Sequence, residues 1–436
     1  MFVLSRLARL FVTTLLLASS WTLSADVQKV TQPDNAAGVA TGQSINLITA
    51  IAKTFTHNPA LRTFDYAIKA QSGRQLQAGM AASPELGFTL EDAFGSGVYN
   101  GTDNAQLTLG IAWVLEGDIR QGYINVASAG RVQLDTEKKI KRLNAAAETA
   151  RLYLACLTAQ AQLDNADKSL ALAAQTVAAV KLRSEAGNAP EAELARAQAE
   201  FYRQQLERED IAYKLSSAIH QLAAQWGETK PYFVSVEGDV FQLPAVQSFE
   251  QLKNQLETSP EFSRLMSEQH LLQAQLNLAR SQGDSPWRVD LGVRHYETSN
   301  DQALVAGMSI PFGERSRNSG NIIEAREKLA QIRAKTDALK IRYETTLYVL
   351  SRQLQRSLQR VISYQNSIIP QLEKALAETR RAYQLGRYSY LEWHTVQADL
   401  LAARSSLIEA SSNAHLKVIE IERLTGVSMT LNNTKS

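Results

Sequence analysis

The chain has 436 residues, of which 46 are Lys or Arg and 44 are Asp or Glu, so its formal charge is close to zero. These charges are interspersed and form no basic patch, which argues against nucleic acid as a partner. With 10 prolines and 22 glycines among tracts rich in Ala, Leu, Gln, Glu and Arg, the composition is typical of long helices. The one cysteine, Cys156, has no intramolecular disulfide partner and is expected to be a small apolar helix residue.

Residues 1–25 have the pattern of a signal peptide, because Arg6 and Arg9 precede a short apolar run and small residues lead to a cleavage site after Ala25. A retained membrane anchor is the alternative, although the run is short for a spanning helix. Residues 26–43 have little pattern and are expected to form an extended N-terminal arm. No later stretch approaches the ~20 consecutive apolar residues of a spanning helix, so membrane insertion there requires β-strands.

The rest of the chain consists of two similar halves. The segment from Gly187 to Glu193 aligns with that from Gly386 to Glu392 at an offset of 199 residues, and Asn58-Pro59 pairs with Ser259-Pro260 after a small gap. This similarity predicts a duplication. The predicted organisation is repeat 1 at 44–228, an equatorial connector with a small strand at 229–246, repeat 2 at 247–427 and a C-terminal tail at 428–436.

Each repeat has the same predicted layout: an opening helical tract, two short strands, a long helix and, after a glycine-marked break, a closing helix. The opening tracts are expected at 44–80 and 248–282. The predicted strands are 85–92, 105–113, 287–296 and 302–310, the long helices 118–185 and 318–384, and the closing helices 190–226 and 389–425.

An apolar seam with alternating spacings of four and three residues runs along both long helices and is typical of a coiled coil. At 1.5 Å per residue, about 65 residues span roughly 100 Å, so each long helix must pack against shorter helices and other subunits. Pro370 is expected to kink the second one. The seam residues are Leu143, Ala147, Ala150, Leu154, Leu157 and Ala161 in the first helix, and Leu347, Leu350, Leu354, Leu358, Val361, Ile368 and Leu372 in the second.

The four strands alternate apolar and polar residues, which is the pattern of a transmembrane barrel, and a small soluble sandwich is the alternative. Four strands leave two unpaired edges that lipid does not tolerate, so three chains are expected to contribute about twelve strands to one barrel. The predicted fold is therefore mainly α with a transmembrane β-barrel, in which a trimeric barrel continues into a periplasmic α-helical coiled-coil barrel. The residues expected to face outer-membrane lipid are Leu107, Leu109, Ile111, Trp113, Trp287, Val289 and Leu291.

Several motifs make the chain resemble the outer-membrane factor family typified by TolC, and in particular its heavy-metal efflux branch of the CzcC and CusC type. They are Asn58-Pro59-Ala60-Leu61, Ser83-Pro84-Glu85-Leu86, Ser309-Ile310-Pro311-Phe312-Gly313, Pro370 and the segment from Tyr383 to Glu392. Val114 departs from the pattern, because that strand end usually holds proline. The resemblance implies a homotrimer that works with a periplasmic adaptor (a membrane fusion protein) and an inner-membrane pump of the RND type.

The resemblance also implies that the two glycine-marked breaks form the periplasmic tip. The gate candidates are Glu392, which matches an acidic position of the family, Tyr383, which matches a tyrosine that ties the closed tip, and Arg387 and Tyr388. Adaptor docking is expected at Gly187, Asn188, Leu385 and Gly386. For Glu392 the alternative is an ordinary first-turn carboxylate, and for the others ordinary helix packing or helix termination.

No catalytic, metal or cofactor site is predicted. The six histidines form no i, i+4 pair and have no Cys partner, and no nucleophile motif or phosphate loop appears. His394, near the tip, is expected to be a helix-surface residue. The predicted function is an efflux duct for heavy-metal cations. The alternatives are a duct for drugs or for type I protein secretion, and a periplasmic adaptor or structural coiled-coil protein.

Overall fold

The structure, a computed structural model, describes residues 42–244, 246–284, 286–311 and 318–427. The predicted signal peptide, the arm up to residue 41, the tail at 428–436 and Phe312-Gly313 of the family motif lie outside the described residues. The described helices are α1 Leu47–His57, α2 Pro59–Gly79, α3 Asp118–Glu185, α4 Glu191–Ala224, α5 Phe249–Leu256, α6 Pro260–Ser281, α8 Ser319–Ser363, α9 Ile369–Gln384 and α10 Tyr390–Thr425. The described strands are β1 Gln43–Ile45, β2 Glu85–Glu91, β3 Gln106–Leu115, β4 Phe233–Val236, β5 Trp287–Tyr296 and β6 Asp301–Ser309.

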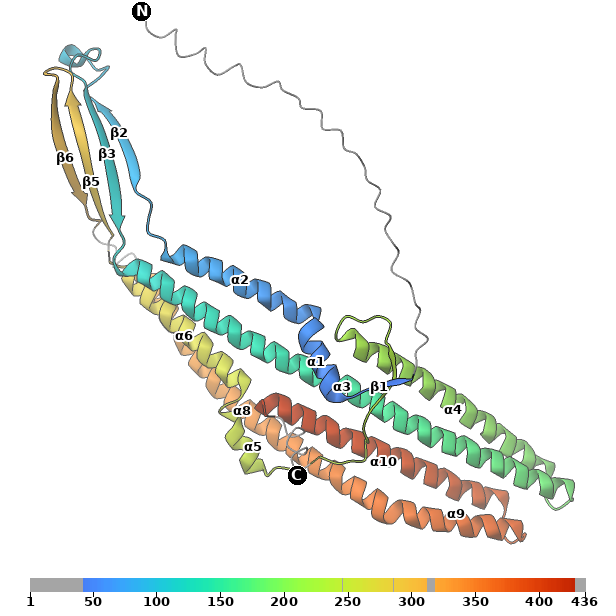
Figure 1. Ribbon diagram of the computed structural model, residues 1–436. Coiled ribbons are helices and arrows are strands. Elements are labelled where there is room, and N and C mark those ends of the chain that lie inside the picture. Colours follow the sequence, from blue (N-terminus) through green and yellow to red (C-terminus); the bar gives the residue numbers. More distant parts are fainter. Residues whose placement is uncertain (1–41, 245, 285, 312–317, 428–436) are drawn as a thin grey trace, which may run out of the picture. The chain divides into compact units, whose positions relative to one another are not determined.

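The helix α3 is the common partner of the helical layer (Figure 1). Its first half packs against α2 and α6, and its second half packs against α4 and α10. The helices α8 and α9 follow one another along the far side of α10. Among the described helices, not one combines the length and the hydropathy needed to cross a bilayer.

The opening tracts are not single helices, and this part of the prediction is wrong. Asn58 ends α1 in an extended conformation (ψ 119°), and its side chain then accepts a hydrogen bond from the backbone N–H of Ala60 at 2.9 Å. Pro59 occupies the first turn of α2, where no backbone N–H is required. In the second repeat α5 ends at Leu256 and Pro260 opens α6 after Ser259, whose side chain makes no capping bond. A residue before proline disfavours the helical conformation, which explains both breaks.

The first helix also begins later than predicted, because residue 44 belongs to a strand. Gln43–Ile45 form β1, which pairs in parallel with β4 of the connector. The side chain of Gln160 completes this edge: its Oε1 accepts from the N–H of Val236 at 2.7 Å, and its Nε2 donates to the carbonyl of the same residue at 3.0 Å. The phenol of Tyr153 donates to the carbonyl of Ile45 at 3.1 Å. The connector is thereby attached to the middle of α3.

Buried clusters lie on either side of this connector. One joins α3 and α4 to the two short strands through Tyr153, Leu222 and Phe233. The other joins α5, α8 and α10 through Leu252, Leu347 and Leu354. Of the predicted seam residues, the buried ones are Ala147, Leu154, Leu347, Leu354 and Val361. Ile368 is 39 % exposed, so its assignment to the seam is wrong.

The second long helix is interrupted where the kink is predicted. A π-helical turn, Tyr364–Ile368, separates α8 from α9, and the N–H of Ile369 donates to the carbonyl of Tyr364. Pro370 has no N–H to donate and its ring displaces the carbonyl four residues before it, which favours a wider turn at this point. The prediction of one uninterrupted α-helix at 318–384 is therefore corrected to two α-helices and a π turn.

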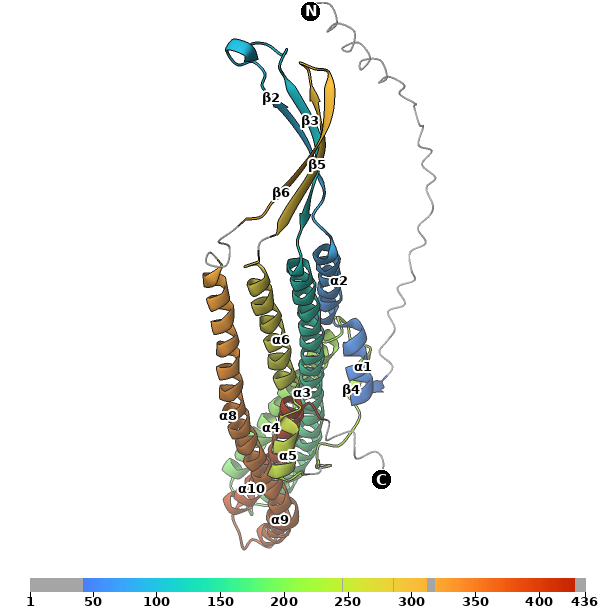
Figure 2. The same ribbon diagram turned by 90° about the vertical axis from the view of Figure 1, so that its left-hand side faces the viewer.

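The four longer strands form one antiparallel sheet in the order β2-β3-β5-β6 (Figure 2). The pairing of β3 with β5 joins the two repeats, with Leu109 opposite Val293 and Ile111 opposite Leu291. Because paired residues project from the same face, all predicted lipid-facing residues share one face of the sheet. Leu86 is 75 % exposed and Leu304 is 89 % exposed on this face. Within the described part of the chain no second sheet covers it, which disfavours the sandwich alternative.

Candidate functional site

The two glycine-marked breaks are helix-ending turns of the same geometry. At the end of α3, the N–H of Gly187 donates to the carbonyl of Ser184 (3.0 Å) and the N–H of Asn188 to that of Arg183 (2.9 Å). At the end of α9, Gly386 and the residue after it make the equivalent bonds, at 3.0 and 2.9 Å. Gly187 and Gly386 have φ of +73° and +72°, the left-handed conformation that this turn requires. The two repeats therefore end their long helices by the same hydrogen bonds.

Tyr383 connects the α9–α10 hairpin to the α3–α4 hairpin. Its side chain is 1 % exposed, its ring lies 5.1 Å from that of Trp393 on α10, and its hydroxyl donates to Oε2 of Glu193 on α4 at 3.1 Å. Val180 of α3 and Ala197 of α4 complete the same buried cluster. All four helices thus contribute to one small core beside the two turns. We call it the tip core.

Arg183 of α3 contacts both turns at once. One guanidinium nitrogen donates to the carbonyl oxygen of Tyr383, and Nη2 donates to the carbonyl oxygen of Asn188 at 3.1 Å. The guanidinium carbon also lies 4.6 Å from the centre of the Tyr383 ring, within the range of a cation–π contact. A Cβ atom at Gly386 would lie 3.6 Å from Nη2 of Arg183. This one side chain therefore holds the end of α9 against the end of α3.

Burial sets the protonation of the tip core. It raises the pKa of Tyr383 to about 12, and the neighbouring Glu193 carboxylate acts in the same direction. Burial also raises the pKa of Tyr390. Tyr383 is therefore a neutral donor across the physiological range, and its bond to Glu193 does not depend on the titration of the phenol.

Glu392 is engaged as a helix cap. Its Oε2 accepts from the backbone N–H of Ser389 at 2.7 Å and from the hydroxyl of Ser389 at 2.9 Å, while Ser389 Oγ accepts from the N–H of Glu392 at 3.3 Å. The Ser389 bonds hold the pKa of Glu392 below its usual value. Glu392 therefore acts as an ordinary carboxylate in the first turn of α10, where it caps the helix. This is the alternative to a gating role that the sequence analysis gives.

The other predicted tip residues lie at the surface of the second turn or the first. Tyr388 is 46 % exposed and Leu385 is 60 % exposed. Arg387, Gly386, Gly187 and Asn188 are also exposed. His394 lies one turn into α10, with its Nε2 3.7 Å from Oε2 of Glu200 on α4. Within the described residues there is no group of three His, Cys, Asp or Glu side chains arranged to hold a metal ion.

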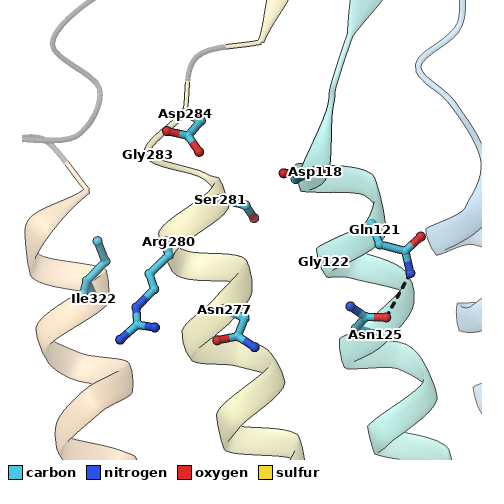
Figure 3. A pocket seen from close by; sticks show the side chains of 10 residues that line it. All are labelled: Asp118, Gln121, Gly122, Asn125, Asn277, Arg280, Ser281, Gly283, Asp284 and Ile322. Atoms are coloured by element: carbon cyan, nitrogen blue, oxygen red, sulfur yellow. Dashed lines mark hydrogen bonds between the residues drawn. The ribbon is translucent and has the colours of Figure 1, made fainter.

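A polar cavity of about 620 Å³ lies at the opposite end of the helices, below the sheet (Figure 3). Gln121 and Asn125 of α3 line one wall and are hydrogen bonded to each other at 3.0 Å. Arg280 of α6 lines the opposite wall. The glycine at 122 permits the close approach of the two helices, because a Cβ there would lie 2.8 Å from Cδ1 of Leu278.

Sequence reasoning missed Arg183, Glu193 and Trp393 as parts of the tip core. A basic residue in the last turn of a long helix is a weak signal, since it also suits the helix dipole. Glu193, in the first turn of α4, is an equally weak signal, because an acidic residue at the start of a helix also suits the helix dipole. The stronger signal was the alignment of the two turns, which placed Arg183 and Ala382 at equivalent positions and pointed to the end of α3.

Comparisons with known proteins agree with this geometry. The family model described as outer membrane efflux protein matches residues 50–228. The cobalt-zinc-cadmium resistance protein CzcC of Cupriavidus metallidurans is 26 % identical over 394 residues, which cover 90 % of this chain and 92 % of that protein. The nickel-cobalt-cadmium resistance protein NccC of Alcaligenes xylosoxydans xylosoxydans is 25 % identical over 277 residues, 63 % of this chain and 62 % of that protein.

Among solved structures, the outer membrane protein VceC of Vibrio cholerae shares the fold with a TM-score of 0.71 at 17 % identity, covering 88 % of this chain and 96 % of that chain. The long helices and few strands of this chain are therefore arranged in the same fold as that outer membrane protein. The match to the outer membrane efflux protein family covers residues 50–228, and the similarity to CzcC extends over most of the chain. This match agrees with the expected location in the bacterial outer membrane, with a periplasmic extension.

Proposed function

We propose that three copies of this chain form one efflux duct, in which about twelve strands make a barrel in the outer membrane and the helices make a periplasmic tube. One observation carries the proposal: a single sheet has an apolar face exposed along its whole length, a charged opposite face and unpaired edges at β2 and β6. Lipid accepts the apolar face only if both edges are paired. Pairing β6 of one copy with β2 of the next satisfies both.

The assembly is tested by producing the chain in a Gram-negative host and separating the membranes. We expect it in the outer-membrane fraction as a species that migrates as a trimer without heating and as a monomer after heating. In planar bilayers this species should conduct ions. Recovery with the soluble periplasmic proteins would contradict the proposal.

For the substrate, we propose heavy-metal cations. The support is the similarity to CzcC and NccC, whose names describe resistance to cobalt, zinc, cadmium and nickel. Deleting the gene should lower the tolerated concentration of these ions and leave drug tolerance unchanged. Loss of drug tolerance, or of secretion of a protein, would favour one of the alternative ducts.

The partners we propose are a periplasmic adaptor of the membrane fusion type and an inner-membrane pump of the RND type. The exposed turns at Gly187-Asn188 and Leu385-Gly386 support docking there, because glycine allows another backbone to approach closely. A bulky substitution at Asn188, such as Asn188→Trp, should abolish capture by the adaptor while the trimer still forms. Asn165→Trp, a change on α3 far from the turns, serves as a control.

The gate that we propose is the tip core together with the exposed residues around it. Tyr383 and Arg183 join the two hairpins of one chain, so separating the hairpins requires breaking the contacts described above. Glu392, Arg387 and Tyr388 are available at the surface for contacts between copies. Glu392 then has two functions, because its carboxylate already caps α10.

The adaptor or structural coiled-coil alternative is less well supported. It calls for one helical hairpin and one contiguous β-domain, whereas here β2 and β3 come from one repeat and β5 and β6 from the other. The helical hairpins are likewise two, α3–α4 and α9–α10.

A further inference from the structure

The charged face of the sheet holds two arginines, each with a glutamate partner. Nη2 of Arg288 lies 2.6 Å from Oε2 of Glu85, and Nη2 of Arg294 lies 2.7 Å from Oε2 of Glu91. Arg294 also donates from Nε to Oγ1 of Thr108 at 2.9 Å. These four charges therefore neutralise one another in pairs along the face.

Asp290 lies on the same face between the two pairs and has no such partner. It stands opposite Ala112 on β3 and opposite Gly307 on β6, neither of which has a polar side chain. With the side chains of the described residues it forms neither an ion pair nor a hydrogen bond. Asp301, a further acid of this face, begins β6 beside the hairpin and is exposed to solvent. Arg288, two residues earlier on β5, attracts Asp290 as well as Glu85, so three carboxylates share two guanidinium groups in the body of the sheet, and Asp290 leaves one excess negative charge there.

Glycines keep the surroundings of Asp290 free of side chains. A Cβ at Gly307 would lie 2.6 Å from Oδ1 of Asp290 and closer still to Oδ2, so the carboxylate lies directly over β6 at this position. The next row along the face has glycine on three adjacent strands, Gly87, Gly110 and Gly292, and valine on the fourth, Val305. A Cβ at Gly292 would lie 2.9 Å from the carbonyl oxygen of Leu109. The backbone packing excludes a side chain there, and the carboxylate keeps an open side.

We propose that Asp290 determines the preference of the duct for cations over anions in its membrane-embedded part. The inference rests on the proposed assembly, in which the charged face lines the lumen. Threefold symmetry then brings three Asp290 carboxylates to one level of the barrel, while the glutamates remain paired with arginine. Rings of unpaired carboxylates raise the local concentration of cations in a pore and repel anions.

The test is the reversal potential of purified trimers in planar bilayers under a salt gradient at low ionic strength, where screening is weak. Asp290→Asn should lower the ratio of potassium to chloride permeability by at least about threefold. Asp290→Glu keeps the charge and should keep the preference. The matched control is the double variant Glu91→Gln with Arg294→Gln, which removes one acid and one base together and should leave the ratio unchanged.

The outcomes separate the inference from the assembly on which it rests. If Asp290→Asn forms heat-modifiable, conducting trimers with an unaltered reversal potential, the role of Asp290 is wrong and the duct stands. If the double control changes the ratio as much as Asp290→Asn does, the paired charges matter equally and the inference is overturned. If the unmodified trimer does not conduct, the proposed function itself fails.

Discussion

The hydroxyl of Tyr383 lies 3.1 Å from Oε2 of Glu193 and donates a hydrogen bond to it, which links residues 190 positions apart in the chain. The same tyrosine offers its backbone carbonyl to Arg183, so one residue of α9 is held both by α3 and by α4. A relative motion of the two hairpins must break both contacts together.

Removing the phenol should therefore loosen the tip. Tyr383→Phe keeps the ring in the tip core but loses the hydrogen bond, worth about 1 kcal/mol, which corresponds to roughly a fivefold change in an equilibrium. We expect a comparable rise in the open fraction of single trimers in planar bilayers. Tyr213→Phe is the control, since Tyr213 is 72 % exposed and lies on α4 far from the tip core. Equal open fractions in Tyr383→Phe and the unmodified trimer would remove Tyr383 from the gate.

The turn at Gly386 should not accept a side chain. Its φ of +72° is unfavourable for alanine, so Gly386→Ala is expected to cost about 1 to 2 kcal/mol and to lower the thermal unfolding temperature. Gly187→Ala should behave alike, because the two turns have the same geometry. Gly73→Ala is the matched control: Gly73 lies within α2, no atom is within 4 Å of its added Cβ, and alanine favours the helix. A stable Gly386→Ala protein would contradict the strain at this turn.

The two faces of the sheet should differ sharply in their tolerance of charge. Leu109 is 54 % exposed on the apolar face, and an arginine in its place should cost about 2 to 4 kcal/mol near the middle of a bilayer. Leu109→Arg is expected to reduce the heat-modifiable trimer in the outer-membrane fraction. Thr89→Arg places the same side chain on the charged face and should assemble normally. The reverse result would mean that the sheet has the opposite orientation.

Mild acid should weaken the contact between α10 and the connector. His415 is buried against the carbonyl oxygen of Val240, 3.0 Å from Nε2, and burial lowers its pKa. The unfolded chain then takes up the proton first as pH falls, so stability is complete above about pH 6.5 and declines from there toward the lower folded pKa. His415→Gln should show a smaller loss of unfolding free energy between about pH 7.5 and 5.5. His220→Gln, at an exposed position, is the control and should lose as much unfolding free energy over this pH range as the unmodified protein.

Local signals account for most of what could be predicted from the sequence. Alternation along β3 and β5 placed Leu109 and Leu291 on one face, because side-chain direction in a strand depends only on the residue's position. Gly187 and Gly386 marked the ends of α3 and α9, because few other residues adopt a positive φ.

Long-range contacts account for the rest. Gln43–Ile45 is too short to show alternation, and it becomes a strand only because β4, about 190 residues later, lies beside it. Arg183 and Tyr383 meet because two hairpins pack together, and neither residue has a local sequence pattern that announces the contact. The helix breaks at Pro59 and Pro260 did have a local signal, because the residue before a proline disfavours the helical conformation. The apolar periodicity that continues across each proline favoured a single helix instead.

The π turn at Tyr364–Ile368 decides which side of α9 faces the tip core. Upstream, the inward positions recur every seven residues, at Leu347, Leu354 and Val361. The next would be Ile368, yet the inward positions after the turn are Leu376 and Tyr383, one residue out of phase with that series. A π turn accommodates one extra residue, which accounts for the shift. Deleting one residue there should turn the π turn into an ordinary α-helical turn and bring Tyr383 into the seven-residue series of Leu347, Leu354 and Val361, so the phenol stays beside Glu193. The wider turn thus lets the helix carry one more residue while the same side of α9 still faces the tip core.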